Sequence, residues 1–179
     1  MKAYSLQTIE IRLAALDDIQ EMVDIKIDKL HVGEPVHPLD GMMQELFLRE
    51  FKKRWEIRLK QGVDTLLITA DRQIVGFVSY SAYEDPARSL LRAAEISHLY
   101  ILPDIRRKRL GSRLCRAALV KIREGGFDNV VVWVPSCSRP SIRFYEQLDF
   151  KPMACERIER IRDQIELREI CYQLELKST

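Results

Sequence analysis

The sequence predicts a mixed α/β fold, because strand patterns and helix patterns alternate along the chain. Segment 129–134, NVVVWV, is a continuous apolar run, typical of a strand that is covered on both faces. Two apolar stretches, 64–70 and 73–83, flank Asp71 and Arg72, which indicates an antiparallel hairpin with a tight turn. Together with the helical patterns between the strands, these observations favour one mixed sheet with helices on its faces.

The remaining elements follow from spacing and from stop signals. Asp17, with Gln20 three residues later, resembles a capping box at the start of a first helix. In a second helix an apolar residue recurs every fourth position from Met43 to Leu59, opposite a basic face. A third helix spans 111–124, ended by two glycines, and a fourth begins at Ser138 with Pro140 in its first turn. The other expected strands are 8–14, 90–102, 150–158 and 168–176, whereas 159–167 is compatible with a loop or with one or two helical turns. The expected order is therefore β-α-α-β-β-β-α-β-α-β-β, in a single domain of residues 1–179.

Composition excludes several function classes. The 179 residues are 46% hydrophobic and 31% charged, with a net charge of +2, which is typical of a soluble globular protein. The near balance of charge argues against a general nucleic-acid binder. The N-terminal segment lacks a signal-peptide core, and no run approaches the ~20 apolar residues of a membrane span. The four cysteines form no C-x-x-C pair, so we expect reduced thiols in a cytoplasmic protein and treat Cys137 as a bystander thiol.

The stretch 103–111, PDIRRKRLG, places four basic residues between an apolar strand and a glycine that opens a helix. A helix N-terminus offers N–H groups without helical partners and the positive end of the helix dipole. Anions bind at such ends, and nearby cations add to the attraction. The sequence therefore predicts a phosphate-binding loop here.

This region resembles a known family. EISHLYILPDIRRKRLGSRLCRAAL is similar to the acetyl-CoA-binding segment of the GNAT N-acetyltransferase superfamily, which has an aliphatic strand, a proline and Arg/Gln-x-x-Gly-x-Gly/Ala at a helix start. SIRFYEQLDF resembles a second GNAT motif, Ala-x-x-x-Tyr-Glu-x-x-Gly-Phe, and IEIRLAALDDIQEMVDI resembles the first strand and helix. The resemblance covers nearly the whole chain and implies a GNAT-like acyl-CoA N-acyltransferase fold.

The match to the phosphate-binding motif includes departures. Arg106 takes its leading position and Gly111 its last glycine, but Arg109 replaces the middle glycine and Arg107 a second frequent one. If residue 109 needs a positive φ, arginine there costs on the order of 1 kcal/mol. Asp149 also replaces a usual glycine.

The resemblance implies the residues that bind acetyl-CoA. The backbone of Leu99, Tyr100 and Ile101 would pair with the pantetheine arm and supply an oxyanion donor. The other implied contacts are Arg106, Arg107, Lys108, Arg109, Gly111, Ser112 and Ser138, the last standing where an asparagine often contacts CoA.

Two residues are candidates for the chemistry. Transfer of an acetyl group to an amine needs a base for the amine and benefits from an acid for the departing thiolate. The resemblance implies Glu95 as base and Tyr145 as acid, and a tyrosine pKa of about 10 against about 8.5 for a thiol permits that donation. The alternatives are a carboxylate on a half-exposed strand for Glu95 and a core aromatic for Tyr145. We expect His98 to be a packed or half-exposed side chain.

A run of potential metal ligands follows the first helix. Asp28, His31, Glu34, His37 and Asp40 recur every third residue, but glycine and prolines among them leave no element to align them, so we expect no metal. The resemblance implies that this loop helps to shape the acceptor pocket.

The sequence thus predicts an acetyl-CoA-dependent N-acetyltransferase that acts on a primary amine, without a nucleic-acid or membrane partner. A homodimer is compatible with the resemblance, and the acceptor stays open. Two alternatives are a GNAT-like protein that has lost catalysis and a polyanion binder. The latter would use 106–109 and the basic face of the 45–60 helix.

Overall fold

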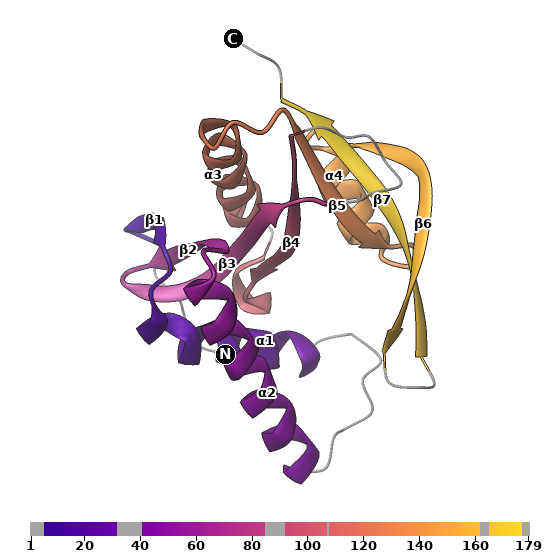
Figure 1. The fold of residues 1–179 in the computed structure, drawn as a ribbon. Helices are drawn as coiled ribbons and strands as arrows, with labels where there is room; N and C mark the ends of the chain where they lie inside the picture. Colours follow the sequence, from indigo (N-terminus) through magenta and orange to yellow (C-terminus); the bar gives the residue numbers. More distant parts are fainter. Residues whose placement is uncertain (1–5, 32–40, 85–91, 107, 162–164, 177–179) are drawn as a thin grey trace. The chain divides into compact units, whose positions relative to one another are not determined.

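The computed structural model describes residues 6–31, 41–84, 92–106, 108–161 and 165–176. It confirms a mixed α/β fold with the order of helices and strands expected from the sequence (Figure 1). The elements are β1 (Ile9–Leu13), α1 (Ile19–His31), α2 (Gly41–Lys60), β2 (Asp64–Ala70), β3 (Gln73–Ala82), β4 (Ala93–Ile101), α3 (Leu110–Glu124), β5 (Asn129–Pro135), α4 (Arg139–Glu146), β6 (Lys151–Ile161) and β7 (Ile165–Glu175). Two short 3-10 helices, η1 (Leu16–Asp18) and η2 (Pro103–Ile105), precede α1 and follow β4.

The strands are hydrogen-bonded in the order β1-β2-β3-β4-β5-β7-β6. The pair β4–β5 is parallel and is connected through α3, whereas β1–β2, β5–β7 and β6–β7 are antiparallel. The chain forms two compact units, and each is described by itself. Unit 1 comprises Met1–Ser79 and His98–Ala118, and unit 2 comprises Tyr80–Ser97 and Leu119–Thr179.

The core of unit 1 is built around the β2–β3 hairpin. Its two turn residues, Asp71 and Arg72, have φ of 47° and 69°, as a two-residue hairpin turn of the I′ type requires. Trp55 of α2 is buried and packs edge-on against Phe77 of β3, with ring centroids 5.3 Å apart. The spacing of apolar residues in α2 thus marks the helix face that enters the core.

The start of the first helix differs from the prediction, because Asp17 is not its N-cap. Residues Leu16–Asp18 form η1, and the neighbouring Asp18 supplies the carboxylate. Asp18 accepts hydrogen bonds from the Ala15 N–H at 2.7 Å and from both terminal nitrogens of Arg12, each also at 2.7 Å. The Arg12 hydrogen bonds hold the pKa of Asp18 below its usual value, and they raise that of Arg12. Arg12 of β1 therefore determines that Asp18, and not the adjacent Asp17, accepts the hydrogen bonds at the start of this helix.

Unit 2 contains a long β6–β7 hairpin, in which the two strands run side by side (Figure 1). Segment 159–167, left open between loop and helix by the sequence, is strand where it is described: β6 continues to Ile161 and β7 begins at Ile165. The register shifts between Pro152 and Glu156. On the next strand, β5, Val130, Val131, Val132 and Val134 are buried.

The four cysteines differ in exposure. Cys115 in unit 1 and Cys171 in unit 2 are buried, Cys155 is half-buried, and Cys137 is exposed. Burial raises the pKa of Cys115 to about 12, so this thiol stays protonated at neutral pH. All four are free thiols, as expected from their spacing.

Candidate functional site

The loop between β4 and α3 is anchored at its start. The Leu102 N–H donates to the Val75 carbonyl at 2.9 Å, and Ile105 of η2 is buried. Arg106 turns back on the strand, with its Nε 3.3 Å from the Ile101 carbonyl oxygen. The basic residues 106, 108 and 109 are exposed, whereas Arg107 lies outside the described residues. The described part of the loop therefore presents Arg106, Lys108 and Arg109 to solvent.

Arg109 stands where the family motif has a glycine, and its backbone adopts a conformation that glycine tolerates best. Its φ is 60°, in the left-handed region. The Arg109 carbonyl accepts the Arg113 N–H at 3.0 Å, so Arg109 caps the N-terminus of α3. The next three residues, 110–112, form the first helical turn, whose N–H groups have no carbonyl partner within the helix. This helix start therefore offers N–H groups of the kind that bind anions.

Strand β4 carries the backbone that the resemblance assigns to the pantetheine arm. Leu99 and Ile101 are half-buried, and Tyr100 is buried with its ring 5.0 Å from that of Phe77. A Cβ atom on Gly76 would lie 2.5 Å from the Tyr100 carbonyl oxygen. Glycine at position 76 thus allows β3 to approach β4 closely.

His98 is a packed side chain, in agreement with the prediction. It is half-buried, and its ring lies edge-on to Trp55 with centroids 5.3 Å apart. Its Nδ1 is 3.2 Å from the Ser79 hydroxyl oxygen. These contacts orient the ring within unit 1.

Glu95 lies at the last paired position between β4 and β5 in unit 2. The parallel ladder runs from Ala93 opposite Asn129 to Glu95 opposite Val131, although both strands continue further. Glu95 is half-buried. Residues paired across neighbouring strands point to the same face of a sheet, so Glu95 shares a face with Val131.

Tyr145 is held by aromatic contacts at the end of α4. It is buried, and its ring lies 5.0 Å from Phe144 and 5.4 Å from Phe150, nearly perpendicular to both. Ser138 occupies the N-cap position of α4, as predicted, but its hydroxyl donates to the Ser141 hydroxyl at 2.8 Å rather than to a backbone N–H.

The C-terminus of α4 depends on the second replaced glycine. Asp149 has a φ of 66°, and its N–H donates to the Glu146 carbonyl at 3.1 Å. The Phe150 N–H reaches back to the Tyr145 carbonyl, also at 3.1 Å. This pair of bonds is the Schellman motif, in which the left-handed position usually belongs to glycine. Asp149 therefore occupies a position whose backbone conformation favours glycine, the usual residue of the family motif.

The candidate base and the candidate acid lie on opposite faces of the unit 2 sheet. Tyr172, opposite Val132 in register, meets Glu146 of α4; burial and the nearby, hydrogen-bonded Glu146 carboxylate raise the pKa of Tyr172. Helix α4 therefore covers the face that carries Val132. Glu95 aligns with the adjacent Val131, which points to the other face.

The Glu95 face also carries a cluster of side chains that the sequence did not predict. Arg157 of β6 donates through Nε to Glu169 of β7 at 2.6 Å, and its guanidinium lies 4.6 Å from the centre of the Trp133 ring. Glu169 is buried. The only sequence signal was a tryptophan within the otherwise aliphatic 129–134 run, because the partners come from distant segments.

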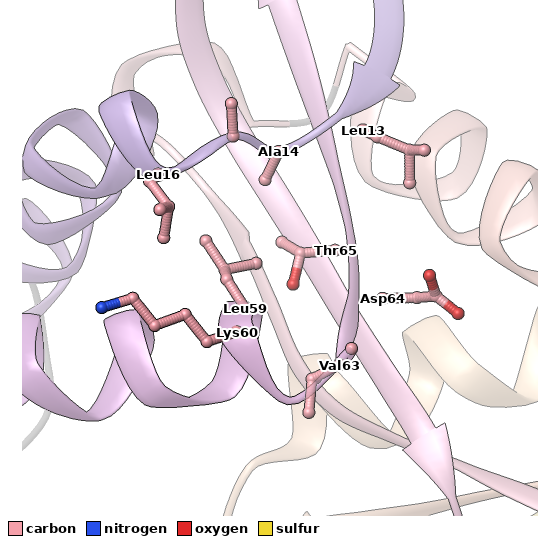
Figure 2. A pocket seen from close by; sticks show the side chains of 10 residues that line it. Leu13, Ala14, Leu16, Leu59, Lys60, Val63, Asp64 and Thr65 are labelled. Atoms are coloured by element: carbon pink, nitrogen blue, oxygen red, sulfur yellow. The ribbon is translucent and has the colours of Figure 1, made fainter.

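A shallow pocket of about 310 Å³ lies elsewhere in unit 1. Figure 2 shows the side chains around it, most of which are apolar. Its lining is Leu13, Ala14, Ala15, Leu16, Leu59, Lys60, Gly62, Val63, Asp64 and Thr65. No predicted site residue belongs to this lining, so we assign the pocket no role in the chemistry.

No group of three or more candidate metal ligands occurs among the described residues. Of the sequence candidates, Glu34, His37 and Asp40 lie outside those residues, and the side chains of Asp28 and His31 are not described. In the same part of the chain, no helix is both long and apolar enough to cross a membrane.

The mixed sheet, the helix start after β4 and the α4 motif define a protein with the acyl-CoA N-acyltransferase type of fold. Residues 32–150 match the acetyltransferase (GNAT) family, and the chain belongs to this family.

Solved structures share this fold. An N-acetyltransferase from Staphylococcus aureus Mu50 is 19% identical, with a TM-score of 0.74, over 96% of this chain and 100% of that one. The protein yncA from Salmonella typhimurium, whose structure contains its cofactor acetyl-CoA, is 18% identical with a TM-score of 0.70, over 96% and 95% of the chains. The probable N-acetyltransferase camello of Xenopus laevis is 28% identical over 81 residues, which are 45% of this chain and only 35% of camello.

Proposed function

We propose that this protein is an acetyl-CoA-dependent N-acetyltransferase that transfers the acetyl group directly to a primary amine. The observation that carries the proposal is the left-handed φ of 60° at Arg109, immediately before α3. This conformation is one that glycine, the usual residue of the family motif, adopts readily, and the first N–H groups of α3 suit a pyrophosphate. The acetyl-CoA in yncA, a protein of the same fold, supports this choice of cosubstrate.

In this proposal the exposed cations of the loop complete the phosphate site. Arg106 and Lys108 flank the one position that is not described, and Arg109 extends from the helix cap. Charge-assisted hydrogen bonds from such groups to phosphate are stronger than neutral ones. Gly111 and Ser112 contribute backbone N–H groups, and Ser138 contacts CoA from the α4 start. Beyond the loop, the backbone of Leu99–Ile101 pairs with the pantetheine arm, and an N–H there stabilises the oxyanion.

Glu95 acts as the base in this proposal, directly or through a water molecule. An alkylamine with a pKa of about 10.4 is mostly protonated at neutral pH and must lose a proton before it attacks. Tyr145 acts as the acid. A C–N bond forms and the C–S bond breaks, while Glu95 accepts a proton from nitrogen and Tyr145 donates one to sulfur.

Calorimetric titration with acetyl-CoA tests the cosubstrate assignment. We expect saturable binding that weakens with salt, because phosphate contacts are ionic. Absence of binding at high micromolar acetyl-CoA would contradict the proposal. If the protein instead bound nucleic acid, with an affinity that falls steeply as salt is added, the result would favour the polyanion-binding alternative.

Substitution tests the catalytic roles. Tyr145→Phe and Glu95→Gln should each lower kcat about 100-fold, as expected for loss of a general acid or base, while acetyl-CoA binding is largely retained. Tyr172→Phe is the matched control, because it removes the hydroxyl of another buried tyrosine in unit 2. Wild-type turnover in both catalytic variants would refute the assignments.

The catalytically inactive alternative depends on Arg109 and Asp149 in place of glycines. Both residues adopt a left-handed backbone conformation, which glycine tolerates best, so the proposal does not require a different backbone at either position. Turnover with any amine would exclude it.

A further inference from the structure

We propose that Arg157 binds a carboxylate of the acceptor, so that the acceptor is an amine that also carries a carboxylate group. The inference deepens the proposed function and rests on it. It concerns the cluster of Arg157, Trp133 and Glu169, which lies within unit 2.

The cluster shares a sheet face with the candidate base. Glu95 aligns with Val131, and Trp133 follows two residues later on β5, so its side chain points to the same face. In register, Trp133 is opposite Cys171, and Glu169 precedes that residue by two positions. Arg157 is opposite Glu169 on β6. This face is the one that α4 does not cover.

The Arg157 side chain is held in place by its neighbours, but only part of its hydrogen-bonding capacity is engaged. Its Nε donates to Glu169 at 2.6 Å, and its Cζ lies 4.6 Å from the centroid of the Trp133 ring. The side chain is nevertheless 42% exposed, whereas that of Glu169 is only 8% exposed. Within the described part of the chain, no hydrogen bond or ion pair involves the two terminal nitrogens of Arg157. A guanidinium held at Nε keeps the fork of its two terminal nitrogens, which matches a carboxylate in a bidentate arrangement.

The separation between the two groups fits a short amino acid. Trp133 lies about 7 Å along β5 from the position opposite Glu95, at about 3.3 Å per residue. With the guanidinium 4.6 Å from the centre of that ring and β4 about 4.8 Å from β5, Arg157 and Glu95 are on the order of 10 Å apart. A small amino acid spans a similar distance once a charged hydrogen bond of about 2.8 Å is added at each end. Glu95 would attract the ammonium end, and Arg157 the carboxylate end.

The wild-type protein provides the first test. The common α-amino acids, β-alanine and 4-aminobutyrate are compared with their primary amides, as acceptors with acetyl-CoA and as ligands in calorimetry without it. We expect at least one acid to exceed its amide about tenfold or more in kcat/KM and in affinity, as for loss of a hydrogen-bonded charge. Equal values for every acid and amide, or acetylation only of amines without a carboxylate, would overturn the inference while leaving the proposed function intact. Failure to bind acetyl-CoA would instead count against the proposed function, and the calorimetry of acids and amides would still judge the carboxylate site.

Variants of Arg157 provide the second test. Arg157→Gln should raise KM for the preferred acid about tenfold or more and abolish its advantage over the amide. Arg157→Lys should restore it in part, since lysine keeps the charge but not the fork. The control is Arg168→Gln: this arginine is opposite Ile158 on the other face, and it forms an exposed ion pair with Glu156 at 3.3 Å. A preserved acid preference in a folded Arg157→Gln protein, checked by its melting curve, would refute the carboxylate site.

Discussion

The conformation of Arg109 can be tested by replacing it with glycine and with alanine. Neither variant carries the charge, and only glycine relieves the left-handed backbone. The Arg109 side chain is exposed, and no side-chain hydrogen bond or ion pair is assigned to it among the described residues, so little packing is lost in either case. The difference between the two variants therefore isolates the backbone.

The expected difference follows from two opposing contributions. A left-handed φ costs a residue with a Cβ about 1–2 kcal/mol. A chain with glycine at this position is more flexible when unfolded, which lowers the free energy of unfolding by about 0.4–1 kcal/mol relative to alanine. Arg109→Gly should thus exceed Arg109→Ala in free energy of unfolding by about 1 kcal/mol, or about 2–4 °C in Tm for a protein of this size. At a position with an ordinary negative φ, the alanine variant would instead be the more stable of the two. An alanine variant as stable as the glycine variant, in urea or thermal unfolding, therefore refutes the left-handed conformation of Arg109.

The same pair of variants tests the charge. An exposed ionic contact contributes about 0.2–1 kcal/mol, so both variants should bind acetyl-CoA up to about fivefold more weakly than the wild type. The loss should shrink at high salt. Tighter binding by Arg109→Gly than by the wild type would show that the arginine side chain obstructs the site.

Three further predictions concern the same scaffold. Asp149→Gly should stabilise the protein relative to Asp149→Ala by about 1 kcal/mol in urea unfolding, and the opposite order would exclude the Schellman geometry at that residue. Gly76→Ala should lower the free energy of unfolding by about 1–3 kcal/mol, since its Cβ meets the Tyr100 carbonyl; an unchanged melting curve would contradict the close approach of the strands. Because Arg12 lowers the pKa of Asp18, this carboxylate stabilises the fold at neutral pH and loses that contribution as the pH falls below about 4. Asp18→Asn should therefore be less stable than the wild type by about 1–3 kcal/mol at pH 7, with the gap closing on acidification, and a gap that is independent of pH would refute this role.

The order of helices and strands could be predicted because it depends on local patterns. Apolar periodicity identified the strands and helices, and the adjacent Asp71 and Arg72 identified the hairpin turn. The choice between Asp17 and Asp18 could not be predicted, since both suit a helix start and the fork from Arg12 decides between them. Such a choice depends on a partner in another element.

The phosphate-binding loop could be predicted from its composition and its place before a helix, but the conformation of Arg109 could not. The Arg157 cluster was beyond sequence reasoning for a different reason. Continuing the register from Lys151 opposite Gln173 would place Arg157 opposite Leu167, but the irregularity in β6 brings it opposite Glu169. A local irregularity of two residues thus decides which charges meet.

The two buried cysteines make each compact unit observable on its own. Cys115 belongs to unit 1 and Cys171 to unit 2, and neither thiol can reach a water-soluble disulfide reagent while its surroundings stay closed. Their reaction rates therefore measure how often each unit opens, much as amide hydrogen exchange measures local opening. The exposed Cys137 gives the reference rate for an unprotected thiol within the same molecule. If the units open separately, Cys115 and Cys171 will be labelled at different rates, and a ligand held by one unit alone will slow only the thiol of that unit.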